Sequence, residues 1–273
     1  MSPESTPQPA EVTELHARIL RLALGVEESR SYWQHVEPAV PRTQRAMQAF
    51  EQRWFGSKSL YRVRFILANF AERYDAFPDA LAALRRWTNM DAPTRQLVCH
   101  WHLQLSDPMY RRFTSTFLVE RRAMREPRVD RDVVLRWVKS EYPDKWAEAT
   151  YVQYAQKLLS AASEAGLISP RRDPRTFPFP KVTDLALAYL LRVLQQTRFE
   201  GTHLDNPYLR SVGLTDAFLD QRLSKLDGLE YRRMGALFEF HWARPTLSAW
   251  AEATLSPLVV APLQQGEHGD ASQ

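Results

Sequence analysis

Hydrophobic residues recur at intervals of three and four along most of this chain, which is the spacing of one face of an α-helix. The best example is KSLYRVRFILANFAERYDAF, whose apolar row is Leu60, Val63, Leu67, Phe70 and Tyr74. Ser57 or Ser59 is placed to cap this helix, and Asp91 followed by Pro93 predicts the start of another. The pattern therefore predicts a helical domain over residues 12–105.

The next segment, residues 106–182, predicts three helices followed by a hairpin. The helices are SDPMYRRFTSTFLVERRAMRE, VDRDVVLRWVKSEYP and EATYVQYAQKLLSAASEAGLI, and the hairpin is SPRRDPRTFPFPKV. Asp130 and Thr150 are the expected N-caps, and Gly166 is the expected C-terminal stop. Proline excludes the hairpin from the middle of a sheet but is tolerated in an exposed wing. This order is typical of a winged helix-turn-helix domain, which binds nucleic acid.

Residues 183–243 repeat the layout more weakly. Three helical segments, VTDLALAYLLRVLQQT, DNPYLRSV and TDAFLDQRLSKL, precede LEYRRM and ALFEFHW, which alternate as a two-stranded hairpin does. Residues 1–11 are predicted to be a disordered tail, and residues 244–273 a C-terminal helix with a second disordered tail. The sequence thus predicts a mainly α protein with an N-terminal helical bundle and two winged-helix-like units that carry small β-hairpin wings.

Charge is concentrated in the first of these two units. The whole chain has a formal net charge of +4, but residues 111–181 contain 15 Lys and Arg against 9 Asp and Glu. A local basic excess of this kind is expected where a protein contacts phosphates. Of the 36 basic residues 30 are arginine, but a GC-rich genome also favours arginine, so this abundance decides nothing by itself.

Candidate DNA contacts lie on the third helix and the wing of residues 106–182. The outward face of the helix is expected to present polar side chains to a groove, and the wing is expected to reach phosphates. Basic residues of the first helix are additional candidates. The full set is Thr150, Tyr151, Gln153, Tyr154, Lys157, Arg171, Arg172, Arg175, Arg111, Arg112 and Lys181. The third helix offers no outward Arg or Asn, so the sequence predicts salt-sensitive binding to the DNA backbone with little base specificity.

Enzymatic motifs are not found. The sequence has no phosphate-binding glycine loop and no G-x-S-x-G element, so we expect no catalytic residues and no cofactor. The stretch CHWH, with Cys99, His100 and His102, lacks the paired spacing of a zinc site, and no metal is expected. One cysteine and the absence of a secretory signal or long apolar run predict a soluble cytoplasmic protein with no membrane partner.

The succession of segments resembles the BrxA family, small proteins of bacterial BREX phage-defence systems. The resemblance rests on GVEESRSYWQHV, SKSLYRVRFILANFAERYDAFPDALAAL, VCHWHLQLSDPMYRRFTSTFLVERR, WAEATYVQYAQKLLSAASEAGLI and LALAYLLRVLQQTRFEG, in that order, over roughly residues 12–242. The Pro-rich start of the chain and residues 244–273 depart from the family pattern. The resemblance implies a mostly helical, non-enzymatic protein that binds double-stranded DNA and acts with other BREX proteins, which include a methyltransferase, a phosphatase-like protein and an ATPase.

Three other functions remain open at this point. Winged-helix folds also bind proteins, so a scaffold or adaptor within the defence complex is one alternative. A transcriptional regulator is another, although the plain third helix speaks against sharp base reading. A nuclease whose site is assembled from distant residues is the third.

Overall fold

The computed structural model of the chain describes residues 8–170, 172–235 and 237–255, and it is mainly helical. The helices of the first part are α1 (Arg18–Arg21), α2 (Val26–His35), α3 (Arg42–Glu51), α4 (Leu60–Phe70) continued by the π-helical turn η1 (Ala71–Asp75), α5 (Pro78–Arg86) and α6 (Ala92–Ser106). Next come α7 (Pro108–Arg112), the π-helical turn η2 (Phe113–Phe117), α8 (Leu118–Ala123), α9 (Arg131–Glu141) and α10 (Glu148–Glu164). The last part holds α11 (Asp184–Gln195), α12 (Pro207–Ser211), α13 (Asp216–Leu223), the strands β1 (Leu229–Met234) and β2 (Leu237–Trp242), and α14 (Leu247–Thr254).

The starts of α4 and α6 follow capping residues that the sequence predicts. The hydroxyl of Ser59 accepts a hydrogen bond from the backbone N–H of Arg62 at 3.3 Å. The carboxylate of Asp91 accepts from Thr94 N at 2.7 Å, and Pro93 lies in the same first turn. Each cap satisfies a backbone donor that the helix itself leaves without a partner.

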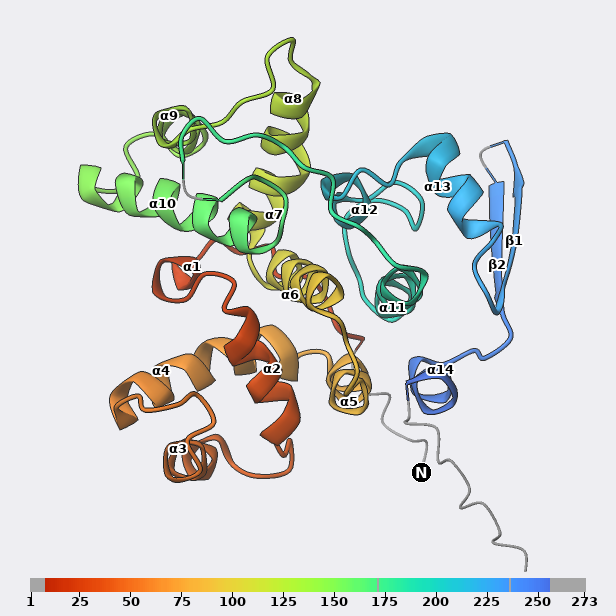
Figure 1. Cartoon of the computed structure of the whole chain (residues 1–273), viewed down its shortest axis with the longest axis horizontal. Coiled ribbons are helices and arrows are strands. Elements are labelled where there is room, and N and C mark those ends of the chain that lie inside the picture. The colour runs from red at the N-terminus through yellow and green to blue at the C-terminus, as the bar shows by residue number, and fades with distance from the viewer. Residues whose placement is uncertain (1–7, 171, 236, 256–273) are drawn as a thin grey trace, which may run out of the picture.

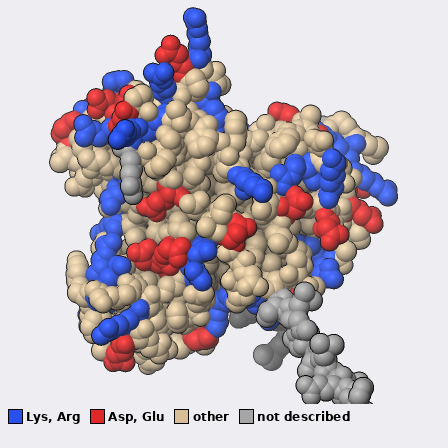
Figure 2. Space-filling view, in the orientation of Figure 1, with Lys and Arg blue, Asp and Glu red and all other residues tan. Residues whose placement is uncertain are grey.

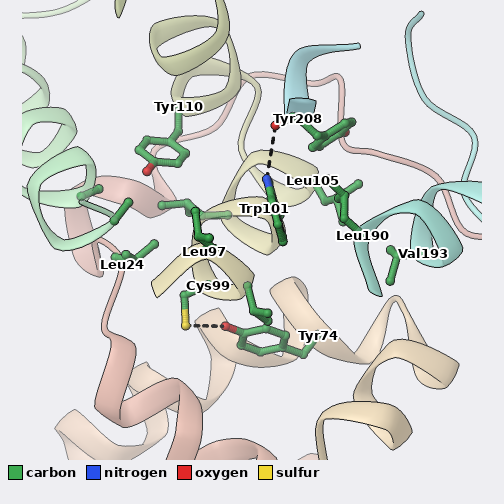
Figure 3. Close-up of a cluster of buried hydrophobic side chains, with 14 of the residues drawn as sticks. Leu24, Tyr74, Leu97, Cys99, Trp101, Leu105, Tyr110, Leu190, Val193 and Tyr208 are labelled. Atoms are coloured by element: carbon green, nitrogen blue, oxygen red, sulfur yellow. Dashed lines mark hydrogen bonds between the residues drawn. The ribbon is translucent and has the colours of Figure 1, made fainter. Parts of the chain in front are cut away.

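Helix α6 lies at the centre of the molecule (Figure 1). Every side chain from Leu97 to Ser106 is buried, because helices from all parts of the chain pack around it. Figure 3 shows the indole of Trp101 donating to the carbonyl of Tyr208, at 3.2 Å, and the hydroxyl of Tyr74 meeting the Cys99 sulfur at 3.9 Å. The buried apolar residues form one continuous cluster, which joins the three predicted units.

The two histidines of α6 lie inside this cluster. His100 lies 2.9 Å from both the Tyr110 hydroxyl and the Ser211 hydroxyl, and His102 lies 2.6 Å from the Tyr189 hydroxyl. Burial lowers the pKa of each imidazole to about 3, so both are neutral at pH 7. In the described residues, no group of three His, Cys, Asp or Glu side chains is placed to hold a metal ion.

The start of the described chain is part of the core, so the prediction of a disordered tail over residues 1–11 is wrong for its last residues. Ala10 pairs with Arg198 in a parallel bridge, and Glu11 N donates to Arg198 O at 2.9 Å. The Glu11 carboxylate is buried and accepts hydrogen bonds from the Tyr208 hydroxyl and from Glu200 N. Composition suggested a tail because it does not reveal partners nearly two hundred residues away. Residues 1–7 lie outside the described part of the chain.

The predicted hairpin of the last unit is confirmed as the antiparallel pair β1–β2, with Tyr231 opposite Phe240. The guanidinium of Arg192 on α11 lies 4.0 Å from the ring centroid of Trp242, at the end of β2, and 5.5 Å from that of Trp250 on α14. Arg192 also donates to the carbonyl of Arg244 at 2.5 Å. These contacts hold α11, the hairpin and α14 together, and α14 is the C-terminal helix that the sequence predicts. None of the helices in the described ranges combines the length and apolar character required to span a bilayer.

Candidate nucleic-acid interface

Residues 106–182 contain the three predicted helical segments in the predicted order. The first is α7 continued by η2 and α8, the second is α9, and the third is α10. The carboxylate of Asp130 accepts from Val133 N at 2.8 Å and so caps α9 as expected. The expected cap at Thr150 is wrong: α10 begins at Glu148 with Ala147 in the cap position, and Thr150 N already donates to Ala147 O.

Tyr151 fixes the connection between α9 and α10. Its side chain is 4% exposed, and its hydroxyl accepts from Lys145 N at 2.8 Å and from Trp146 N at 3.3 Å. The same hydroxyl donates to the carbonyl of Tyr142. The prediction that Tyr151 contacts DNA is therefore wrong in physical terms, because a buried side chain with three backbone partners cannot reach a groove. Its role is to set the position of α10 relative to α9.

We expect Tyr151→Phe to lower the free energy of unfolding by about 1–3 kcal/mol, because two backbone N–H groups of the α9–α10 connection lose their acceptor. Urea unfolding followed by circular dichroism measures this loss. Tyr61→Phe is the matched control, since Tyr61 is 79% exposed and its hydroxyl is free to bind water. Equal stability of the two variants would contradict this role for Tyr151.

The outward face of α10 differs from the predicted one. Tyr154 is fully buried, 4.6 Å from the Trp146 ring, so the prediction that it points outward is wrong. Gln153 is exposed and Thr150 is half-buried, so both side chains remain accessible to a groove. Gln156 is exposed on the same side of the helix and was missed by the sequence pattern. Its i+3 spacing from Gln153 was the available signal.

The sequence predicts a β-hairpin wing over residues 169–182, and the described residues of this segment form a loop whose backbone pairs lie within residues 169–176. No strand occurs among the described residues of this segment, so the β-hairpin prediction is wrong. The pairing is limited to Ser169 N with Thr176 O at 2.9 Å and to an antiparallel bridge between Val129 and Arg175. Prolines in the loop remove the donors that a longer ladder needs. The loop is nevertheless attached to the segment before α9, because the backbone of Arg175 pairs with that of Val129.

Arg175 braces this loop. Its guanidinium donates to Asp173 Oδ1 at 3.0 Å and to Leu159 O at 3.3 Å, and Asp173 also accepts from Arg131 N. Arg175 is thus partly buried and engaged with the protein, which leaves Arg172 as an exposed loop cation. Arg171 lies outside the described residues.

The four remaining candidates have different surroundings. Lys157 is half-buried on α10. Arg111 is 7% exposed, and it donates to the carbonyls of Gln104 and Val12, so the prediction that it contacts DNA is wrong. Arg112 is exposed but forms an ion pair with Glu141 at 2.7 Å. Lys181 is exposed, just before α11.

Four further cations of this segment have the exposure that phosphate contact needs: Arg125, Arg128, Arg136 and Lys145. Among the described residues, no carboxylate lies within ion-pair distance of any of them, and the same holds for Arg172. Figure 2 shows Lys and Arg gathered, with some Asp and Glu, at the end of the molecule where α8, α9 and α10 lie. The sequence located the basic segment, but ion pairs decide which of its cations are free, some with neighbouring acids and some with acids far along the chain.

Comparison with known proteins identifies a fold and no function. No family model matches the chain, and no curated protein matches it. The chain is similar to the crystal structure of an uncharacterized protein from Magnetospirillum magneticum, with a TM-score of 0.55 and 16% sequence identity. The match covers 72% of this chain and 97% of that protein. At this identity the similarity concerns the fold alone.

Proposed function

We propose that this protein binds double-stranded DNA through residues 106–182, which we interpret as a winged helix-turn-helix unit. In this proposal α10 lies in the major groove and the loop of residues 169–176 rests on the phosphates beside it. The protein acts without catalysis, as an accessory of a BREX-type anti-phage defence system. The link to BREX rests on the resemblance of the sequence segments to the BrxA family.

One observation carries the winged-helix interpretation: the backbone of Arg175 pairs with Val129, and the neighbouring Thr176 pairs with Ser169. Arg175 N donates to Val129 O at 2.7 Å, Val129 N donates to Arg175 O at 3.1 Å, and Ser169 N donates to Thr176 O at 2.9 Å. The returning arm of the loop therefore lies between Val129, which precedes the N-cap of α9, and Ser169, which follows α10. A winged helix brings the same three segments together in a small sheet, and here the pairing consists of one bridge and one hydrogen bond.

The charge of this surface favours contact with the DNA backbone. Arg128, Arg136 and Arg172 are exposed at α9 and the loop without described carboxylate partners, whereas α10 presents the uncharged side chains Gln153 and Gln156. Glutamine can bind the edge of adenine, but two glutamines distinguish few sequences. We therefore expect binding that depends strongly on salt and weakly on sequence.

Titration of duplex DNA over a salt series tests this function. We expect the wild type to bind, and Arg128→Ala/Arg136→Ala/Arg172→Ala to reduce the slope of log affinity against log salt by about 3, because each phosphate contact adds about 0.9. The control Arg53→Ala/Arg198→Ala/Arg244→Ala removes three exposed cations from outside residues 106–182 and should leave the slope unchanged. Absence of duplex binding at low salt would refute the proposal.

A protein-binding adaptor is the second candidate, and the tip of the β1–β2 hairpin favours it. Met234 and Leu237 face each other there and are 77% and 72% exposed. Exposed apolar pairs of this kind are typical of protein contacts. A partner protein would support this function in place of DNA binding if its association did not depend on salt and was lost in Met234→Ser/Leu237→Ser.

A further inference from the structure

Helix α4 presents two aromatic rings between two arginines on its outer surface. At 100° per residue, Tyr61 and Phe65 lie at the middle of the outward face, Arg64 lies to one side and Arg62 to the other. The ring of Tyr61 is 79% exposed, the largest exposure of any large hydrophobic side chain in the described residues. Burying such a ring against a ligand would remove a large apolar area from water, so Tyr61 is a candidate contact for a ligand.

Two guanidinium groups hold the inner ring of this pair in place. Arg62 lies 5.2 Å and Arg21 5.7 Å from the centroid of the Phe65 ring. The Phe65 and Tyr61 rings are 6.4 Å apart and inclined by 32°. Tyr61, which lies next to Phe65, is mostly exposed and can therefore contact a flat ligand.

The arginines around these rings have no acidic partner among the described residues. No carboxylate lies within ion-pair distance of Arg21, Arg62 or Arg64, because the acids of this region are engaged elsewhere. Glu72 pairs with Arg18 and Arg42, and Glu28 pairs with Lys58. The cations are therefore available to an anion from solution.

A hollow connects this surface to α10. It has a volume of about 490 Å³, and its lining holds the cations Arg21, Arg62 and Lys157 together with the acids Glu27, Glu28 and Glu164. Figure 2 shows blue side chains following one another along the left edge, between the levels at which Figure 1 places α10 and α4. Glu27 and Glu28 already pair with Arg95 and Lys58, so the arginines at the α4 side of the hollow remain available to a phosphate.

We infer that the surface formed by Arg21, Tyr61, Arg62, Arg64 and Phe65 binds a single strand of nucleic acid. One base stacks on the Tyr61 ring, and the flanking phosphates bind the arginines. A duplex keeps the faces of its bases inside the stack, so an exposed aromatic ring offers it nothing, whereas a single strand has base faces free to stack. This inference does not depend on the duplex contacts proposed for residues 106–182.

Fluorescence anisotropy with a labelled twelve-residue oligothymidine at low salt tests the inference. We expect the wild type to bind, Tyr61→Ala to weaken binding by about tenfold, and Tyr61→Phe to retain it, because stacking needs the ring and not the hydroxyl. Arg21→Ala/Arg62→Ala/Arg64→Ala should reduce the salt slope by about 2, since each contact with a single strand adds about 0.7. The control Arg53→Ala/Arg198→Ala/Arg244→Ala should not change it. An oligouridine of equal length shows whether DNA or RNA is preferred.

The outcome is separable from that of the duplex experiment. Tyr61→Ala should leave duplex affinity and thermal stability unchanged, because its side chain is exposed. Absence of oligothymidine and oligouridine binding, or equal binding by wild type and Tyr61→Ala, would overturn the inference whether or not duplex DNA is bound. Loss of duplex binding in the arginine variant, without any single-strand binding, would also overturn it and assign the surface to a flanking duplex.

Discussion

Acidification from pH 6.5 to pH 4 is expected to lower the free energy of unfolding by about 6 kcal/mol through His100 and His102 together. Both imidazoles have a folded-state pKa of about 3 because they are buried, whereas an unfolded histidine has a pKa near 6.5. Between these values the unfolded chain binds more protons than the folded one, so stability falls as pH falls, by about 1.4 kcal/mol per pH unit for each histidine. Such a loss is comparable to the whole stability of an ordinary domain.

The hydrogen bonds of His100 explain why its neutral form is retained. Ser211 donates its hydroxyl proton to the carbonyl of Tyr208 at 2.9 Å, so the Ser211 oxygen accepts from Nε2 of His100. Nδ1 then accepts from the Tyr110 hydroxyl, and the neutral ring satisfies both neighbours. A second proton on the ring would leave Tyr110 without its acceptor in a site closed to water.

Urea unfolding at a series of pH values measures the effect, and His100→Gln and His102→Gln are the informative variants. Each should make the dependence of stability on pH shallower between pH 6.5 and 4, whatever it does to stability at pH 7. Buried Asp107 acts in the opposite direction, because its raised pKa lets the folded state take up a proton first as pH falls. If both variants keep the wild-type slope, the histidines do not control acid unfolding.

Arg111→Ala is expected to destabilise the fold by about 3–5 kcal/mol, the usual cost of leaving one member of a buried ion pair alone. Its guanidinium lies 3.5 Å from the Glu11 carboxylate, and it donates to Gln104 O at 2.6 Å and to Val12 O at 2.8 Å. The substitution leaves a buried carboxylate and two carbonyls without this donor. Thermal and urea unfolding measure the loss.

A second variant separates this structural role from DNA contact. Glu11→Gln/Arg111→Met removes both charges and should recover part of the stability lost in Arg111→Ala, because no buried charge remains unpaired. The folded double variant should bind duplex DNA with the wild-type salt slope. A reduced slope in this variant would show that Arg111 does contact phosphate.

The helices and their starts could be predicted from the sequence because both depend on residues close together in the chain. Apolar spacing identified α4, α9 and α11, and the caps at Ser59, Asp91 and Asp130 require only an acceptor side chain three residues before a backbone donor. The β1–β2 hairpin could be predicted for the same reason, because its two strands are neighbours in the chain. The prediction of a cap at Thr150 was wrong because the helix begins two residues earlier, and Glu148 and Ala149 are already helical.

The candidate site could be predicted less well because exposure depends on distant partners. Tyr154 looked polar and outward, but α1 covers its side of α10, and its hydroxyl lies 3.5 Å from the carbonyl of His16. Arg111 looked like a phosphate contact, but Glu11 of the predicted tail lies against it. Neither partner lies within one helix length in sequence, so no periodicity signals them. The division of the chain into units remains a prediction.

The attachment of the first described residues has a consequence for how the protein is made. Glu11 receives hydrogen bonds from Glu200 and Tyr208, 189 and 197 residues further along the chain. Ribosomes synthesise proteins from the N-terminus, so this segment emerges long before its partners exist. Helices that need only neighbouring residues can form during translation, whereas the segment around Glu11 must wait. The first part of this structure to leave the ribosome is therefore among the last to reach its place.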